Sequence, residues 1–134
     1  DLYTSIIPNL LVRGMRTALQ KSRAKKVFVM NLMTKYGQTT NYTVSDHIHD
    51  LEHYTGTIDA VLINSQRPTD HVLNKYEKAQ EAVVTNDLKK TDKQIIEASL
   101  IDNKEIRKTS GDSLKRSVIR HHPDKLAKKL ISLL

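Results

Sequence analysis

Cysteine and tryptophan are absent from this sequence of 134 residues, and aromatic residues make up only 4% of it. Without cysteine the chain cannot form a disulfide, a thiolate metal site or a cysteine nucleophile. Its apolar runs, such as Val27–Met30 and Ala60–Ile63, contain far fewer than the roughly 20 residues that a membrane-spanning helix needs. We therefore expect a soluble protein with one core of moderate size and no membrane insertion.

The start of the chain also lacks the features of a secretory signal. Asp1, Leu2 and Tyr3 provide neither an initiator methionine nor a basic segment ahead of an apolar one. This start predicts a mature product or an excised fragment.

Positive charge exceeds negative charge by seven, and it is unevenly distributed. Residues 13–26 contain six lysines and arginines and no acidic residue, while residues 104–129 contain nine against three acidic residues. The scarcity of aromatic rings and the lack of an RNP-like segment disfavour nucleic acid as a partner. The charge is compatible with a solvated helix face, with a pocket for a phosphorylated small molecule and with a surface for an acidic partner. It is also compatible with self-association into a homo-oligomer through residues 13–26.

Apolar residues recur with a helical period in four segments, and short runs rich in β-branched residues lie between them. The predicted helices lie at residues 7–19, 43–56, 69–80 and 123–134. The predicted strands lie at residues 26–31, 59–64 and 82–84, with a weaker fourth strand at residues 94–98. Residues 34–41 are loop by composition, and residues 102–112 are polar and predicted to form a surface excursion.

The alternation of strands and helices predicts the fold class. A strand–helix–strand–helix–strand order implies a parallel sheet with helices on its faces. We therefore predict an α/β fold, a three-layer sandwich with a mostly parallel sheet, over residues 1–134.

Two asparagines end the two clearest strands, Asn31 and Asn64. Because open α/β sheets bind ligands at the carboxyl ends of their strands, these amides indicate a polar site there. The alternative is that each asparagine only begins the turn that follows its strand. The loop at residues 34–42 favours the site, since its threonine, glutamine and asparagine side chains surround Gly37 and suit hydroxyls, amides and phosphates.

Several segments resemble one protein family. Residues 31–47 read NLMTKYGQTTNYTVSDH and resemble the NLMTQPGETxxYTxxDH signature of the CofD/YvcK family, which comprises 2-phospho-lactate transferase-like and gluconeogenesis-factor proteins. Residues 2–11, LYTSIIPNLL, are similar to the family's GPGSLYTSILPNLL segment, and residues 59–64, DAVLIN, to its DVVLVN-like strand. Residues 120–127, RHHPDKLA, are similar to its closing RHDxxKLA segment.

The resemblance implies a Rossmann-like α/β protein of which this chain is the carboxyl-terminal part, without the glycine-rich phosphate loop of the amino-terminal half. The gluconeogenesis-factor branch implies a cytoplasmic regulator that binds UDP-sugars, notably UDP-N-acetylglucosamine, and that serves central carbon metabolism and cell-wall and cell-shape maintenance. The other branch implies an enzyme that transfers a phospho-lactyl group to a deazaflavin with a divalent metal. We predict the regulator, with no catalytic residue assigned, and keep the transferase as the alternative.

By position, the resemblance assigns ligand-binding roles to polar residues near the strand ends: Asn31, Thr34, Thr39, Asp46 and Asn64. Thr4 and Ser5, near a helix start, are expected to help hold a phosphate. Tyr76 either stacks on a ligand ring or packs in the core, and Arg120 is expected to pair with a diphosphate.

This sequence departs from the family pattern at Lys35, Tyr36 and Gln38, where the family has Gln, Pro and Glu. The loss of that glutamate weakens metal-assisted chemistry in the loop. His122 likewise replaces an aspartate in the closing segment.

Two short patterns point to other protein classes. Residues 49–53, HDLEH, approximate the HExxH zinc motif, but Asp50 replaces the general-base glutamate and no third ligand is evident. Residues 122–124, HPD, match the J-domain tripeptide, but too few residues follow for the further helix that a J-domain needs. We therefore predict no metal site.

Overall fold

The structure, a computed structural model, describes residues 1–102 and 118–133. The polar segment predicted at residues 102–112 lies outside the described residues except for Asp102. The described helical elements are a π-helical turn η1 (Leu2–Ile6), α1 (Ile7–Leu10), α2 (Met15–Lys21), α3 (Val44–Thr55), α4 (Asp70–Glu77) and α5 (Pro123–Ile131). The described strands are β1 (Val27–Val29), β2 (Ala60–Asn64) and β3 (Gln94–Ala98).

The three strands form one parallel sheet in the order β1-β2-β3. The central strand β2 aligns Val61 with Phe28 on one side and with Ile95 on the other. The parallel sheet predicted from the alternating pattern is therefore confirmed.

The predicted strand at residues 82–84 is wrong, and the segment predicted as a fourth strand is the third. Val83 makes only an isolated antiparallel bridge to Met33, and the Val84 N–H donates to the Leu32 carbonyl at 3.3 Å. The segment therefore pairs with the loop after β1 and not with the sheet.

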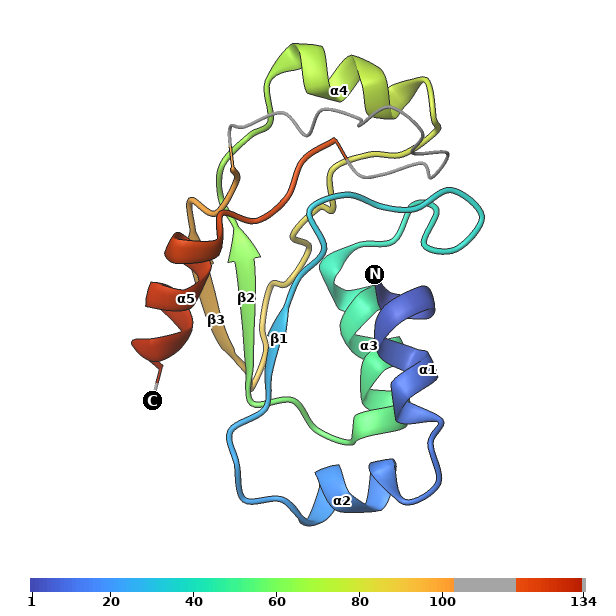
Figure 1. Ribbon diagram of the computed structural model, residues 1–134, viewed down its shortest axis with the longest axis vertical. Helices are drawn as coiled ribbons and strands as arrows, with labels where there is room; N and C mark the ends of the chain where they lie inside the picture. Colours follow the sequence, from blue (N-terminus) through green and yellow to red (C-terminus); the bar gives the residue numbers. More distant parts are fainter. Residues whose placement is uncertain (103–117, 134) are drawn as a thin grey trace, which may run out of the picture.

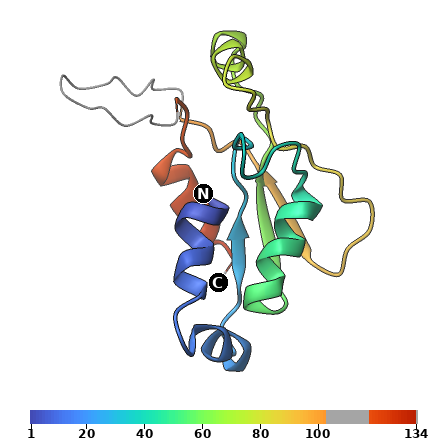
Figure 2. The ribbon, with the colours of Figure 1, turned by 90° about the vertical axis from the view of Figure 1, so that its right-hand side faces the viewer.

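Helices cover both faces of the sheet, which confirms the three layers. On one face, Phe28, Val61 and Ile63 pack in a buried cluster with Ile48 and Leu51 of α3. Figure 1 shows α3 and α1 on that side, and Figure 2, turned to face it, shows the same two helices in front of the sheet. On the other face, a second buried cluster joins the alternate strand residues to α5 and comprises Ala60, Leu62, Ile96 and Leu100, with Leu126 and Leu130 packed against it.

The single helix predicted over residues 7–19 is interrupted. The chain forms η1 and α1, turns, and restarts as α2 after Gly14, whose φ is 88°. This left-handed conformation favours glycine and cannot continue a right-handed helix. Leu11, which belongs to the apolar stripe of the predicted helix, is 67% exposed in the turn, and its neighbour Val12 is 58% exposed.

No helix among residues 1–102 and 118–133 is long and apolar enough to cross a membrane. The longest, α3, contains 12 residues.

Helix α3 begins with a capping box. The Thr43 Oγ1 accepts from the Asp46 backbone N–H at 3.5 Å, and the Asp46 carboxylate accepts from the Thr43 N–H at 2.8 Å. Thr43 also donates to the Asp87 carboxylate at 3.0 Å, which fastens the segment after Val84 to the start of the helix. Thr43 is the N-cap and Gly56, with φ 74°, follows the last residue of the helix, so the helix predicted over residues 43–56 is confirmed.

Two tyrosines attach the amino-terminal turn to α3. The hydroxyls of Tyr3 and Tyr42 both donate to the Oδ2 atom of Asp50, the second at 2.8 Å. These donated hydrogen bonds, that of Tyr3 above all, hold the pKa of Asp50 below its ordinary value. The cluster therefore fixes η1 against α3 through one carboxylate.

Thr43→Ala is expected to lower the free energy of unfolding by about 1–2 kcal/mol, because it removes the N-cap and the contact with Asp87. Urea unfolding measures this change. The exposed Thr57→Ala is the control and should change stability by less than about 0.5 kcal/mol. Equal effects of the two substitutions would contradict the role of the capping box.

Asp50→Asn is expected to destabilise the fold at neutral pH and to lose this effect in acid. The folded-state pKa of Asp50 lies below its unfolded value, so its ionised form contributes stability above about pH 4 and the contribution disappears as the pH falls through the folded-state pKa. Urea unfolding from about pH 7 to about pH 3 measures the difference from the unsubstituted chain. A difference that stays constant across that range would show that ionised Asp50 contributes nothing.

Candidate functional site

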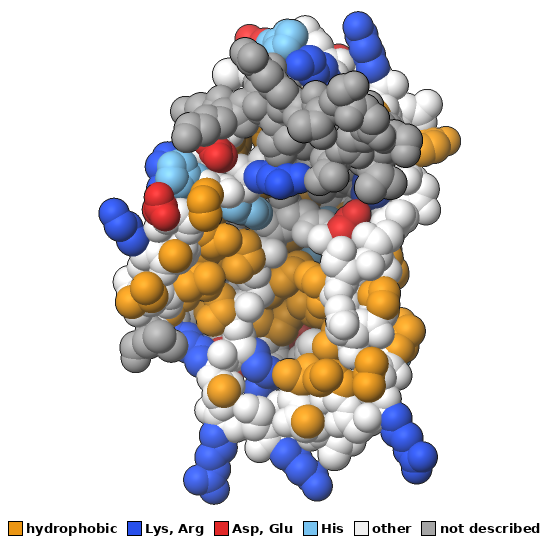
Figure 3. Space-filling view, viewed as in Figure 1, with side chains coloured by type: hydrophobic (Ala, Val, Ile, Leu, Met, Phe, Trp, Pro, Cys, Tyr) orange, Lys and Arg blue, Asp and Glu red, His pale blue; other side chains and the backbone are white. Residues whose placement is uncertain are grey.

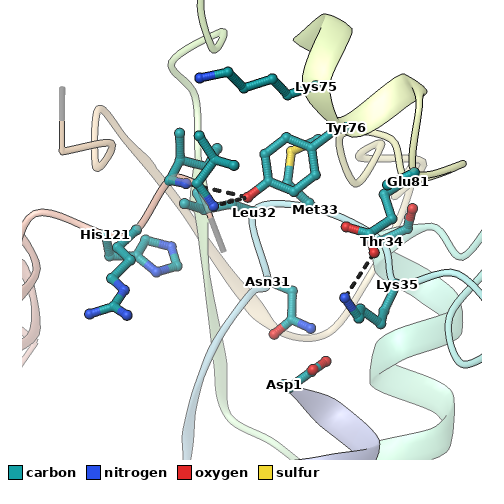
Figure 4. A pocket seen from close by; sticks show the side chains of 14 residues that line it. Asp1, Asn31, Leu32, Met33, Thr34, Lys35, Lys75, Tyr76, Glu81 and His121 are labelled. Atoms are coloured by element: carbon teal, nitrogen blue, oxygen red, sulfur yellow. Dashed lines mark hydrogen bonds and ion pairs between the residues drawn. The ribbon is translucent and has the colours of Figure 1, made fainter. Parts of the chain in front are cut away.

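A cavity of about 430 Å³ lies at the carboxyl edge of the sheet. Its walls come from the loop after β1, from the end of α4 and the turn that follows, and from the segment that leads into α5 (Figure 4). The lining residues used below are Asp1, Asn31, Thr34, Lys35, Lys75, Tyr76, Glu81, Arg120 and His121.

The structure brings together four of the nine residues predicted for the site, namely Asn31, Thr34, Tyr76 and Arg120. The other five do not line this cavity: Thr4, Ser5, Thr39, Asp46 and Asn64. Asp46 is engaged in the capping box of α3, and Thr4 and Ser5 are exposed on η1.

The two asparagines predicted to end strands have different surroundings: Asn64 is the last residue of β2, whereas Asn31 lies two residues beyond β1. The Asn64 Oδ1 accepts from the N–H groups of Gln66 and Leu100 at 3.2 and 3.0 Å, and its amide donates to the Gln66 carbonyl at 2.6 Å. Asn64 thus closes the turn after β2, which is the alternative that the sequence left open. Asn31 lines the cavity, and its half-buried side chain makes no hydrogen bond with the described part of the chain, so its amide can meet a ligand.

The two buried threonines of the loop hold its backbone in place. The Thr34 Oγ1 accepts from the Ala82 N–H at 2.9 Å, and the Thr34 N–H donates to the Ala82 carbonyl at 2.7 Å. The Thr39 Oγ1 accepts from the Lys35 N–H at 2.8 Å. Their hydroxyls therefore hold the backbone of the cavity wall in place through these hydrogen bonds.

Tyr76 connects α4 to the segment on the far side of the cavity. Its side chain is 6% exposed and packs in a buried cluster with Met33 and Val72. Its hydroxyl accepts from the N–H groups of Val118 and Ile119 at 2.9 and 3.3 Å. Core packing, one of the two roles predicted for Tyr76, is present, and the hydroxyl fixes the residues just before Arg120.

An ion pair in the wall was missed by the sequence analysis. The Lys35 Nζ lies 2.8 Å from the Glu81 Oε1, and Glu81 is buried (Figure 4). In the sequence, Lys35 is distinguished only as a departure from the family pattern, and no local signal singles out Glu81. A buried carboxylate needs a paired cation, so Lys35 neutralises Glu81 rather than standing free for a ligand.

His121 is a second lining residue that the sequence analysis did not assign. Its Nε2 is buried and has no hydrogen-bond partner in the described part of the chain. Burial lowers the pKa of His121, so the neutral ring is favoured in the cavity. The only signal for it in the sequence is its position next to Arg120 in the closing motif.

The lining as a whole favours a polar anionic ligand. Lys75 and Arg120 carry positive charge at the wall, while Asp1 carries negative charge and the Lys35–Glu81 pair is neutral. Asn31 adds an amide donor and acceptor, and His121 can gain a proton. This donor set fits a phosphate group together with a hydrogen-bonding ring or sugar.

Within residues 1–102 and 118–133, no three histidine, aspartate or glutamate side chains lie close enough to hold a metal ion. In the HDLEH segment, His49 and His53 are exposed, and Glu52 pairs with Lys93 at 2.8 Å and accepts from the Ile58 N–H at 2.7 Å. The segment therefore anchors the end of α3.

The chain is similar to a known protein family and to several named proteins. A family model described as 2-phospho-L-lactate transferase CofD matches residues 1–102. The gluconeogenesis factor of Bacillus subtilis is 36% identical over 139 residues, which cover 100% of this chain and 40% of that protein. The gluconeogenesis factor of Halalkalibacterium halodurans is 41% identical over 88 residues, which cover 63% of this chain and 27% of that protein.

A crystal structure of a UPF0052-family protein from Bacillus halodurans has the same fold. It matches with a TM-score of 0.81 and 31% identity, over 97% of this chain and 39% of that chain. The chain thus spans at most about two fifths of the length of these relatives. The family model covers more than half of the chain, and a relative more than 30% identical spans all of it, so the chain belongs to the CofD family, which includes the gluconeogenesis factors.

Proposed function

We propose that this chain is the sugar-nucleotide-binding part of a cytoplasmic regulatory protein of the gluconeogenesis-factor type, with a UDP-N-acetylglucosamine-like ligand. The observation that carries the proposal is the cavity at the carboxyl edge of the sheet, where Asn31, Arg120 and His121 meet. The similarity to gluconeogenesis factors over the whole chain supports a role in carbon metabolism. To this we add the regulatory role and the link to cell-wall and cell-shape maintenance that the family resemblance implies.

Each cavity group has a role suited to such a ligand. Arg120, with a fixed positive charge and a fork of N–H donors, pairs with the diphosphate. Asn31 can donate to and accept from an edge of the uracil or the sugar. Tyr76 holds the backbone just before Arg120, which reduces the ordering that binding requires.

The second candidate is a 2-phospho-L-lactate transferase-like enzyme, which the family model favours. The divalent metal of that chemistry needs oxygen ligands. Asp1 and Glu81 are the carboxylates of this cavity, and Glu81 is paired with Lys35, so the described lining does not fit a metal ion. A transferase would therefore need ligands from the part of the family fold that this chain does not span.

Calorimetric titration with UDP-N-acetylglucosamine tests the proposal, with UMP and ATP as competing nucleotides. The protein is titrated as the 134-residue chain and again with this chain replacing the matched region of the Bacillus subtilis gluconeogenesis factor. Asn31→Ala and Arg120→Ala are each expected to weaken binding about tenfold or more, since each removes hydrogen bonds to the ligand.

Matched controls lie outside the cavity. Arg67→Ala and Asn86→Ala remove the same side-chain types from exposed positions and should change the affinity by less than about twofold. Failure of both proteins to bind the UDP-sugar in preference to ATP would contradict the proposal.

Binding is also expected to take up a proton at His121. The diphosphate diester of a UDP-sugar stays ionised near neutral pH, and its negative charge raises the pKa of the ring that burial had lowered. Affinity should therefore rise as the pH falls from about 8 to about 6, and His121→Gln should flatten this dependence. Titration in buffers of different ionisation enthalpy counts the protons, and an unsubstituted protein with a flat profile would rule out His121 as the titrating group.

A further inference from the structure

One end of the cavity contains a carboxylate to which the proposed function assigns no role. Glu81 lines the cavity, and its side chain is 6% exposed. Its Oε1 atom accepts from the Lys35 ammonium group at 2.8 Å. Its Oε2 atom makes no hydrogen bond with any residue that the structure describes. Because each carboxylate oxygen can accept hydrogen bonds, Glu81 retains an acceptor at the cavity wall.

The pairing with Lys35 makes this carboxylate compatible with an anionic ligand. An unpaired carboxylate would repel a diphosphate in the same cavity, whereas the ion pair of Lys35 and Glu81 has no net charge. The lysine occupies one oxygen of the carboxylate and leaves the other for the ligand. Lys35 is therefore a positioning residue, which acts on the ligand through Glu81.

The cavity has two ends with different chemistry. Figure 4 shows His121, from the segment that leads into α5, across the cavity from Lys35 and Glu81. The apolar surface of the molecule lies farther from α4, between α5 and α1 (Figure 3). The end with His121 and Arg120 suits a diphosphate, which only accepts hydrogen bonds, because a guanidinium group only donates them. The end with Glu81 suits a ligand group that donates a hydrogen bond.

We propose that Glu81 accepts a hydrogen bond from a sugar hydroxyl of the ligand, on its ribose or its hexose, and makes the cavity selective for ligands that carry this hydroxyl. The proposal rests on the sugar-nucleotide function proposed above. A hydrogen bond to an ionised acceptor is about twice as strong as one between neutral groups. A ligand without this hydroxyl would exclude water from the Oε2 atom and offer no donor in its place, which weakens binding.

A double-mutant cycle that deletes the hydroxyl from the ligand and the carboxylate from the protein tests this contact. Calorimetry compares UDP-N-acetylglucosamine with a set of analogues that each lack one hydroxyl of the ribose or of the hexose. The proteins are the 134-residue chain and the chain placed in the matched region of the Bacillus subtilis gluconeogenesis factor. In the main variant, Lys35→Met is combined with Glu81→Leu, which removes both charges with little change in volume.

One analogue is expected to bind the unsubstituted protein about tenfold or more weakly than the parent ligand. The doubly substituted protein should bind this analogue and the parent with affinities within about twofold of each other, because the acceptor is gone. The analogue that responds identifies the sugar that carries the hydroxyl. A merely structural role of the ion pair would weaken the binding of all ligands by the same factor. An identical penalty for every analogue in both proteins would therefore overturn the proposal.

Two further variants keep the test independent of the stability of the double substitution. Glu81→Gln retains a neutral acceptor and should reduce the discrimination against the responding analogue by about threefold or more. The control ion pair joins Lys93 and Glu52 at 2.8 Å outside the cavity. In this control, Lys93→Met is combined with Glu52→Gln, which keeps an acceptor for the Ile58 N–H, and every affinity ratio should stay within about twofold.

The outcomes separate this proposal from the proposed function. Failure of both unsubstituted proteins to bind UDP-N-acetylglucosamine would overturn the two together. Binding that is selective for the UDP-sugar, but in which no hydroxyl couples to Glu81, would overturn only the role of Glu81. An equal loss of discrimination in the control pair would overturn it as well, since the effect would not depend on the cavity.

Discussion

Burial of β2 on both of its faces is the constraint on which the rest of the structure depends. Ala60, Val61 and Leu62 are all 0% exposed, and their side chains alternate between the two helical layers. A strand of this kind needs a hydrogen-bonded neighbour on each side and an apolar cover above and below. Two strands and two helices meet these four requirements, namely β1, β3, α3 and α5. β1 and β3 both run parallel to β2, and the segments that contain α3 and α4 connect the strands.

The position of the cavity follows from this arrangement. Since all strands run the same way, the segments that leave them emerge at one edge, and polar side chains can gather there without disturbing the apolar layers. The loop after β1 is then held by Thr34 and Thr39, and the segment leading to α5 is held by Tyr76. Rigid attachment of these irregular segments gives the cavity a defined wall although little of it is helix or strand.

The sequence predicted the parts of the fold that depend on local patterns. Apolar runs identified β1 and β2, and the helical period over residues 43–56 identified α3. The break at Gly14 and the pairing of Val83 with Met33 were not predicted, because both depend on where neighbouring segments lie in space. The same reason separates Asn31 from Asn64 in the site. Nearby backbone groups bind the side-chain amide of Asn64, and none in the described part of the chain binds that of Asn31. Glu81 and His121 line the cavity because of tertiary contacts, which no periodic pattern in the sequence indicates.

The two hydrogen bonds that Tyr76 accepts change the meaning of a conservative exchange. A phenylalanine would fill the same volume in the cluster with Met33 and Val72, and by size and hydropathy it would pass as a neutral replacement. It would, however, leave the N–H groups of Val118 and Ile119 without their acceptor. Ile119 is buried, and a buried donor left unpaired costs about 1–3 kcal/mol. A single phenol oxygen therefore makes hydroxyl chemistry, rather than ring shape, the property that sequence variation must preserve at this position.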